Sequence, residues 1–94
     1  MIEENGRVLA RVTGVVQGVG YRAWVRDEAA RLGLAGWVRN ERDGSVTALL
    51  AGPEAVVARM VAAMRRGPTG ARVTAVATEP VASGEPLDGF RIRR

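Results

Sequence analysis

Three reactive side chains are missing from this 94-residue sequence. It has no cysteine, no histidine and no lysine, so all 14 of its basic residues are arginine. Without cysteine there are no disulfides, thiolate ligands or cysteine nucleophiles. The lack of histidine and lysine also excludes the usual catalytic triads, Schiff bases, Walker A lysines and common zinc sites. An enzyme with this composition must therefore act by positioning and electrostatics.

Long apolar runs are missing as well. No stretch approaches the roughly 18 residues needed to cross a bilayer, and residues 1–5 lack the basic and apolar regions of a signal peptide. We therefore expect a cytoplasmic protein that does not associate with membranes. The composition, 47% hydrophobic and 26% charged, is typical of a single domain over residues 1–94. Residues 1–6 are expected to be a flexible N-terminal extension, and the chain is expected to be a monomer.

A glycine-rich stretch, residues 14–22, joins a strand-like run to a helix-like run and ends in Arg22. Glycine at positions 14, 18 and 20 allows a tight turn and close approach of the backbone to a ligand. Amides of such a loop, next to the first turn of a helix, suit an anion such as inorganic phosphate or sulfate. Arg22 opposes the helix dipole by roughly 0.3–1 kcal/mol unless an anion lies there. The alternatives are a simple turn and a solvated arginine.

Gln17 and Asn40 are unusual polar residues in this chain. Gln17 is its only glutamine, and it either orients the loop or fills a polar turn position. Asn40 is unexpected because asparagine is depleted in strands. Its amide offers one acceptor and two donors, which suits a residue that holds a water molecule in a chosen orientation. The alternative is that Asn40 only begins the turn at residues 42–44, and both interpretations remain open from the residues alone.

Hydrophobic periodicity predicts an α+β fold with the order βαββαβ and a short final strand. The predicted strands cover residues 7–13, 36–41, 45–51, 73–78 and 90–92, and the predicted helices cover residues 21–32 and 54–66. Right-handed crossovers place both helices on one face of a mostly antiparallel sheet, as in a ferredoxin-like split βαβ sandwich. In that fold the loop before Arg22 and the end of the strand with Asn40 are neighbours.

Alternation along the strands also predicts which residues the helices leave uncovered. The open face of the sheet is expected to meet water and to carry Arg7, Leu9, Arg11, Thr13, Thr47, Leu49, Thr74 and Val76. The second helix is expected to bury Val57, Met60, Val61 and Met64. Residues 79–88 are expected to form a polar loop.

Two motifs extend this interpretation: GVVQGVGYR at residues 14–22, and GWVRN at residues 36–40 followed by DGSV at 43–46. Together with matches up to residues 90–92, they resemble the acylphosphatase family over nearly the whole chain. Two departures are small. Val15 stands where the family often has a basic residue, and Tyr21 replaces a frequent phenylalanine, which adds a hydroxyl beside the site.

The resemblance implies hydrolysis of the carboxyl–phosphate bond of an acyl phosphate, without metal or cofactor. It implies that Asn40 positions the attacking water. It also implies that the phosphate is held by the Arg22 side chain and by the loop amides of Gln17, Gly18, Val19, Gly20, Tyr21 and Arg22.

Two other functions compete with this one. A basic ferredoxin-like domain is also the shape of RNA-recognition modules, which stack bases on aromatic residues of the open face. The first and third predicted strands carry no aromatic residue, so we expect no nucleic-acid partner. The second competitor is an acylphosphatase-like fold used for interaction or regulation. The presence of both Arg22 and Asn40 favours activity.

Overall fold

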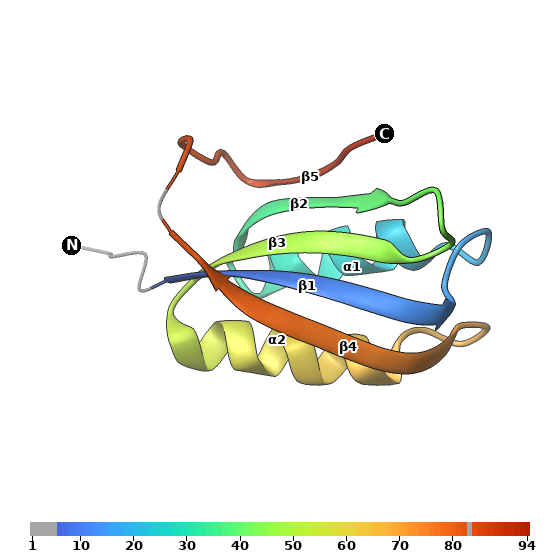
Figure 1. Ribbon diagram of the computed structural model, residues 1–94. Helices are drawn as coiled ribbons and strands as arrows, with labels where there is room; N and C mark the ends of the chain where they lie inside the picture. The colour runs from blue at the N-terminus through green and yellow to red at the C-terminus, as the bar shows by residue number, and fades with distance from the viewer. Residues whose placement is uncertain (1–5, 83) are drawn as a thin grey trace.

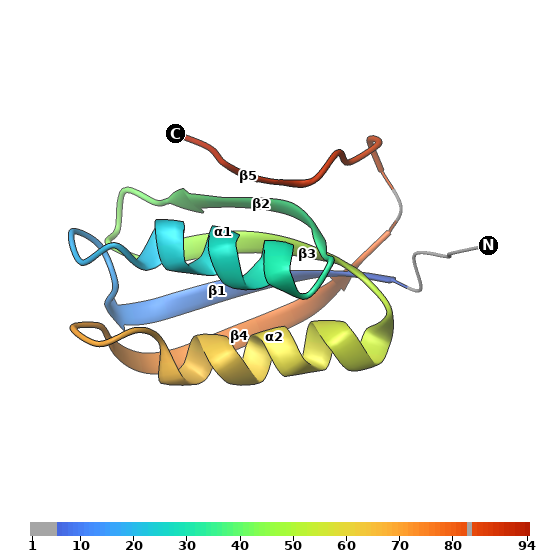
Figure 2. The same ribbon diagram turned by 180° about the vertical axis from the view of Figure 1, so that it is seen from behind.

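The computed structural model describes residues 6–82 and 84–94 and confirms the predicted order of elements (Figure 1). The elements are β1 (Gly6–Val15), α1 (Tyr21–Arg31), β2 (Ala35–Asn40), β3 (Val46–Gly52), α2 (Glu54–Arg66), β4 (Arg72–Val81) and β5 (Phe90–Ile92). Both helices cover one face of a single sheet, as Figure 2 shows from behind. Within the described residues, no helix is long and apolar enough to cross a membrane. The ferredoxin-like α+β fold is confirmed.

The strand order β4-β1-β3-β2-β5 places β3 between β1 and β2. β3 is antiparallel to both neighbours, so β1 and β2 point in the same direction. The fifth strand, β5, pairs in parallel with β2. The carboxyl ends of β1, β2 and β5 therefore meet at one end of the sheet, although they come from distant parts of the sequence.

The core lies between this sheet and the two helices. Its largest fully buried side chains are Tyr21, Leu50, Met60, Met64, Val12, Val16, Val25, Val38 and Val46. Three of the four residues that α2 was predicted to bury are buried. The exception is Val61, which is half-buried, and Ala63 is buried in its place. Tyr21, at the start of α1, donates a hydrogen bond of 2.9 Å from its hydroxyl to the carbonyl oxygen of Met64 on α2. This bond ties the two helices together inside the core.

Several predictions about strand boundaries and faces were wrong. Gly6 is the first residue of β1, not part of an extension; residues 1–5 lie outside the described part of the chain. β4 continues through Pro80 to Val81 because an edge strand tolerates a proline that cannot donate to a ladder. The extended strand shortens the predicted loop at residues 79–88.

Val76 was placed on the wrong face. It lies in the core with 7% exposure. The register of β4 against β1 slips between Thr13, paired with Ala75, and Gly14, paired with Val73, so that Thr74 is an extra residue. Such a bulge interrupts strict alternation, and both Val73 and Val76 face the helices.

The face of the sheet opposite the helices is more covered than predicted. Thr47 and Leu49 are each 7% exposed. Two arginines stack on Trp37, with the guanidinium carbon of Arg39 4.8 Å and that of Arg93 5.0 Å from its ring centroid. The arginines of this face also form ion pairs with carboxylates, namely Arg11 with Asp43, Arg39 with Glu41, Arg91 with Asp88 and Arg93 with Glu85. Their positive charge is therefore offset locally.

Stability at alkaline pH should depend on Tyr21. Burial raises the pKa of this phenol above its usual range, and the chain has no other tyrosine, no lysine and no cysteine. Above pH ~10 the unfolded chain ionises first. Between pH 8 and about 10 the free energy of unfolding should therefore change little, and above that it should fall with a slope approaching about 1.4 kcal/mol per pH unit. Urea unfolding between pH 8 and 11.5 measures it.

The matched variant is Tyr21→Phe. At pH 7 it should lose about 1 kcal/mol of stability because the Met64 carbonyl loses its partner. Its free energy of unfolding should be flat where that of the wild type falls. An equal alkaline slope in both proteins would contradict the assignment to Tyr21.

Candidate active site at the carboxyl ends of β1, β2 and β5

The loop between β1 and α1 is held in place by two valines that pack against the core. Val16 is 1% exposed, and Val19 packs partly against the core. Gly18 and Gly20 have φ angles of 76° and 79°, in the left-handed region, and a Cβ at either residue would meet nothing within 4 Å. Glycine is therefore required here for the backbone conformation, and the space beside the loop is open.

The first turn of α1 faces the same space. Its earliest helical hydrogen bond runs from the Trp24 N–H to the Gly20 carbonyl oxygen, at 3.1 Å. The N–H groups of Tyr21, Arg22 and Ala23 precede that bond and have no partner within the helix. No acidic residue lies in this turn, so the partial positive charge of the helix end adds to that of Arg22.

A cavity of about 320 Å³ lies at this end of the sheet, and it contains both Arg22 and Asn40 in its wall. Its full lining is Val16, Gly18, Gly20, Tyr21, Arg22, Ala23, Asn40, Ile92 and Arg94. The structure thus brings together the glycine loop, the arginine and the asparagine, as the fold predicted. Gln17 and Val19 are the two predicted site residues that do not line it.

Gln17 faces the hairpin between β2 and β3 instead. Its side-chain Nε2 donates to two carbonyl oxygens, those of Glu41 and Ser45, both at 2.8 Å. These are the residues that close the hairpin, because the Glu41 N–H donates to the Ser45 carbonyl oxygen at 2.8 Å. Gln17 therefore holds the glycine loop against the hairpin that follows Asn40.

Asn40 is the last residue of β2, and it lines the cavity. Its Oδ1 atom is buried and accepts no hydrogen bond from the described residues. A buried acceptor without a partner is costly, by about 1–3 kcal/mol. The amide is thus suited to accept a hydrogen bond from a molecule in the cavity.

The hairpin after Asn40 is stiffened by Asp43. One oxygen of its carboxylate accepts hydrogen bonds from the Ser45 N–H at 2.9 Å and the Ser45 Oγ at 2.6 Å. The carboxylate also pairs with Arg11 on β1. The bonds from Ser45, and secondarily the charge of Arg11, lower the pKa of Asp43 to about 2. Asp43 therefore stays charged at neutral pH and keeps the hairpin tied to β1.

Two expectations about the surroundings of the site need correction. The Tyr21 hydroxyl does not lie beside the site, because it is directed into the core toward Met64. Ile92 and Arg94 also line the cavity, and neither was among the site residues predicted from the sequence. Alternation along the last strand, combined with its parallel pairing to β2, is the signal that could have identified them.

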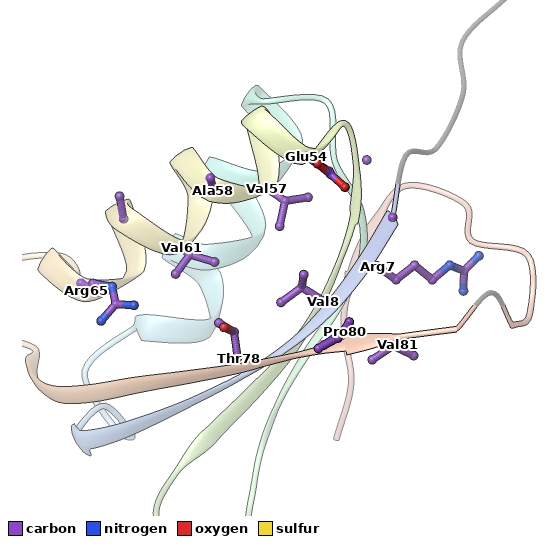
Figure 3. A pocket seen from close by; sticks show the side chains of 13 residues that line it. Arg7, Val8, Glu54, Val57, Ala58, Val61, Arg65, Thr78, Pro80 and Val81 are labelled. Carbon is purple, nitrogen blue, oxygen red and sulfur yellow. The ribbon is translucent and has the colours of Figure 1, made fainter.

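A larger groove of about 650 Å³ lies elsewhere, between α2 and the start of β1 (Figure 3). Val8, Val57 and Val61 point into it, with Glu54 and Arg65 toward its two ends. It is mostly apolar and lies at the opposite end of β1 from the glycine loop. Over the described residues, no three His, Cys, Asp or Glu side chains gather where they could hold a metal ion. The Arg22 cavity is therefore the better candidate for chemistry.

Comparison with known proteins identifies the class. The acylphosphatase family model matches residues 8–92. A curated acylphosphatase from Rhizobium meliloti is 55% identical over 94 residues, covering 100% of this chain and 99% of the relative. The crystal structure of acylphosphatase from Bacillus subtilis has a TM-score of 0.89 and 38% identity, covering 94% of this chain and 98% of that one. The structure of an acylphosphatase from Coxiella burnetii has a TM-score of 0.90 and 30% identity, covering 99% of this chain and 100% of that one.

This small α+β fold is thus shared with a family of hydrolases. The chain belongs to the acylphosphatase family. The resemblance that the sequence motifs suggested is confirmed.

The hydrogen bonds from Gln17 to the hairpin should contribute to the stability of the protein and to the alignment of the glycine loop. Gln17→Glu places a carboxylate against two carbonyl oxygens, so it should destabilise the protein by about 1–3 kcal/mol. It should also weaken binding of inorganic phosphate, because the loop amides lose their alignment. Gln17→Met, which keeps the length but adds no charge, should be intermediate. Urea unfolding and the thermal shift produced by phosphate measure the two effects, and wild-type values in both variants would contradict the role.

Proposed function

We propose that this chain hydrolyses acyl phosphates to a carboxylate and inorganic phosphate. In this proposal the phosphate is held by Arg22 and the loop amides of residues 17–22, and the water is positioned by Asn40. The observation that carries it is the meeting of three features in one cavity. They are a helix N-terminus with no acidic residue in its first turn, a guanidinium, and a buried amide oxygen that has no hydrogen-bond partner among the described residues. The helix end and the guanidinium suit the stabilisation of negative charge, and the amide oxygen suits the positioning of a nucleophile.

The first requirement is stabilisation of negative charge. Phosphoryl transfer needs little covalent work from a protein, since positioning and charge stabilisation supply most of the acceleration. The N–H groups at the start of α1 and the Arg22 guanidinium would contact the equatorial oxygens of the phosphoryl group. Because the N–H groups are fixed by the helix before substrate arrives, they need no reorganisation during the reaction.

The second requirement is an oriented nucleophile. Asn40 Oδ1 would accept a hydrogen bond from the attacking water, which directs a lone pair of the water oxygen toward phosphorus. The new oxygen–phosphorus bond forms as the bond to the acyl oxygen breaks, and the carboxylate leaves with the electron pair. A carboxylate is a good leaving group, so the step needs no strong general acid.

The third requirement is a destination for the proton of the water. None of the side chains lining the cavity is a base at neutral pH: they are arginine, asparagine, tyrosine and apolar residues. We therefore propose that a phosphate oxygen of the substrate accepts the proton. The pH–rate profile should then contain no step that disappears on substitution of a protein side chain.

Substitution of the two proposed residues should separate their roles. Arg22→Ala should abolish activity chiefly by losing phosphate binding. Asn40→Ala should lower kcat by about 10²–10³ while the inhibition constant of inorganic phosphate changes little. The assay is hydrolysis of benzoyl phosphate with excess chelator. Arg26→Ala is the matched control, because Arg26 is exposed one turn further along α1 and pairs with Asp27.

Near-normal turnover of the Asn40→Ala protein would rule out its proposed role. A folded wild-type protein without turnover would favour the alternative, in which the fold serves binding or regulation. An RNA-binding function has less support, because four arginines of the open face are already paired with carboxylates.

A further inference from the structure

Arg94 is placed beside Asn40 by the pairing of the last strand. β5 runs parallel to β2 with Val38 opposite Ile92, and the Arg93 N–H donates to the Val38 carbonyl oxygen at 2.8 Å. Continuing this register by two residues puts Arg94 next to Asn40, at a strand spacing of about 5 Å. Both residues line the same cavity.

Arg94 differs from the neighbouring arginines in the face of the sheet on which it lies and in its ion pairing. Side chains alternate along an extended chain, so Arg91 and Arg93 lie on the opposite face from Ile92 and Arg94. Arg91 pairs there with Asp88, and Arg93 pairs with Glu85. Arg94 forms no ion pair with any carboxylate of residues 6–82 or 84–94. Arg22 and Arg94 are thus two cations in one cavity wall that form no ion pair within the described part of the chain.

The cavity is larger than a phosphate group needs. Its 320 Å³ is at the lower end of the ~300–1,000 Å³ range of small-molecule sites. With phosphate at the loop and water beside Asn40, the space toward β5 is left for the acyl group. That space is bounded by the apolar side chain of Ile92 and by Arg94. A short carbon chain that ends in a negative charge would match both.

Building on the proposed function, we infer that Arg94 selects acyl phosphates whose acyl group carries a second anion a few bonds from the reacting carbonyl. The guanidinium would bind this distal carboxylate or phosphate group while Arg22 holds the reacting phosphoryl group. Because the distal charge does not change during the reaction, the contact is equal in the ground state and the transition state. It should therefore act on KM rather than on kcat.

The test compares two substrates of equal carbon count. Succinyl phosphate ends in a carboxylate, and butyryl phosphate ends in a methyl group. The wild type should show the lower KM for succinyl phosphate. Because Arg94 is exposed, we expect Arg94→Gln to lower the kcat/KM ratio of the two substrates by about fivefold, and Arg94→Glu to lower it further. The preference should also shrink between 0.05 and 0.5 M salt, because exposed charges are screened.

Arg91→Gln is the control, since it removes another exposed arginine, from the opposite face. It should leave the ratio unchanged. A third substrate with a phosphonate in place of the distal carboxylate distinguishes the two kinds of anion. An Arg94→Gln protein with the wild-type ratio for both anionic substrates would overturn the inference. Hydrolysis of butyryl phosphate by the wild type tests the proposed function separately, because that substrate has no group for Arg94.

Discussion

The pairing of β3 with both β1 and β2 is the constraint on which the candidate site depends. β3 is antiparallel to each of them, so their carboxyl ends meet at one end of the sheet. The glycine loop follows β1, and Asn40 ends β2. The amide of Gln17 then fixes the remaining freedom, because it joins the loop to the hairpin that connects β2 with β3. The relative position of the glycine loop and Asn40 is thus set by the backbone ladders together with the Gln17 side chain.

Electrostatics in this chain depend on where arginine meets a carboxylate. On the open face of the sheet four arginines are matched by acidic neighbours. At the cavity the helix end has no acidic residue in its first turn, and Arg22 and Arg94 form no ion pair within the described residues. A net charge of +4 is therefore not spread evenly. Part of it is concentrated where an anionic substrate would bind.

Sequence reasoning predicted the order of the elements and the meeting of Arg22 with Asn40, because both follow from local patterns and the handedness of crossovers. It failed for Val76, since the extra residue Thr74 changes the face of the strand and strands carry no local signal for a bulge. It also missed Arg94. The place of that residue depends on the register of β5 against β2, which is a tertiary pairing. Local patterns therefore predicted the helices and strands, whereas the face of Val76 and the place of Arg94 depend on non-local strand pairing.

The position of β1 between β3 and β4 has a consequence for how the protein is made. β1 is the first described strand of the chain, yet one of its two ladders is completed only by residues 72–81. During synthesis both edges of β1 can be covered only after most of the chain has left the ribosome. Long-range pairing of this kind slows folding and leaves strand edges open in the meantime. The nascent chain should therefore depend on its first strand remaining unpaired with other molecules until β4 arrives.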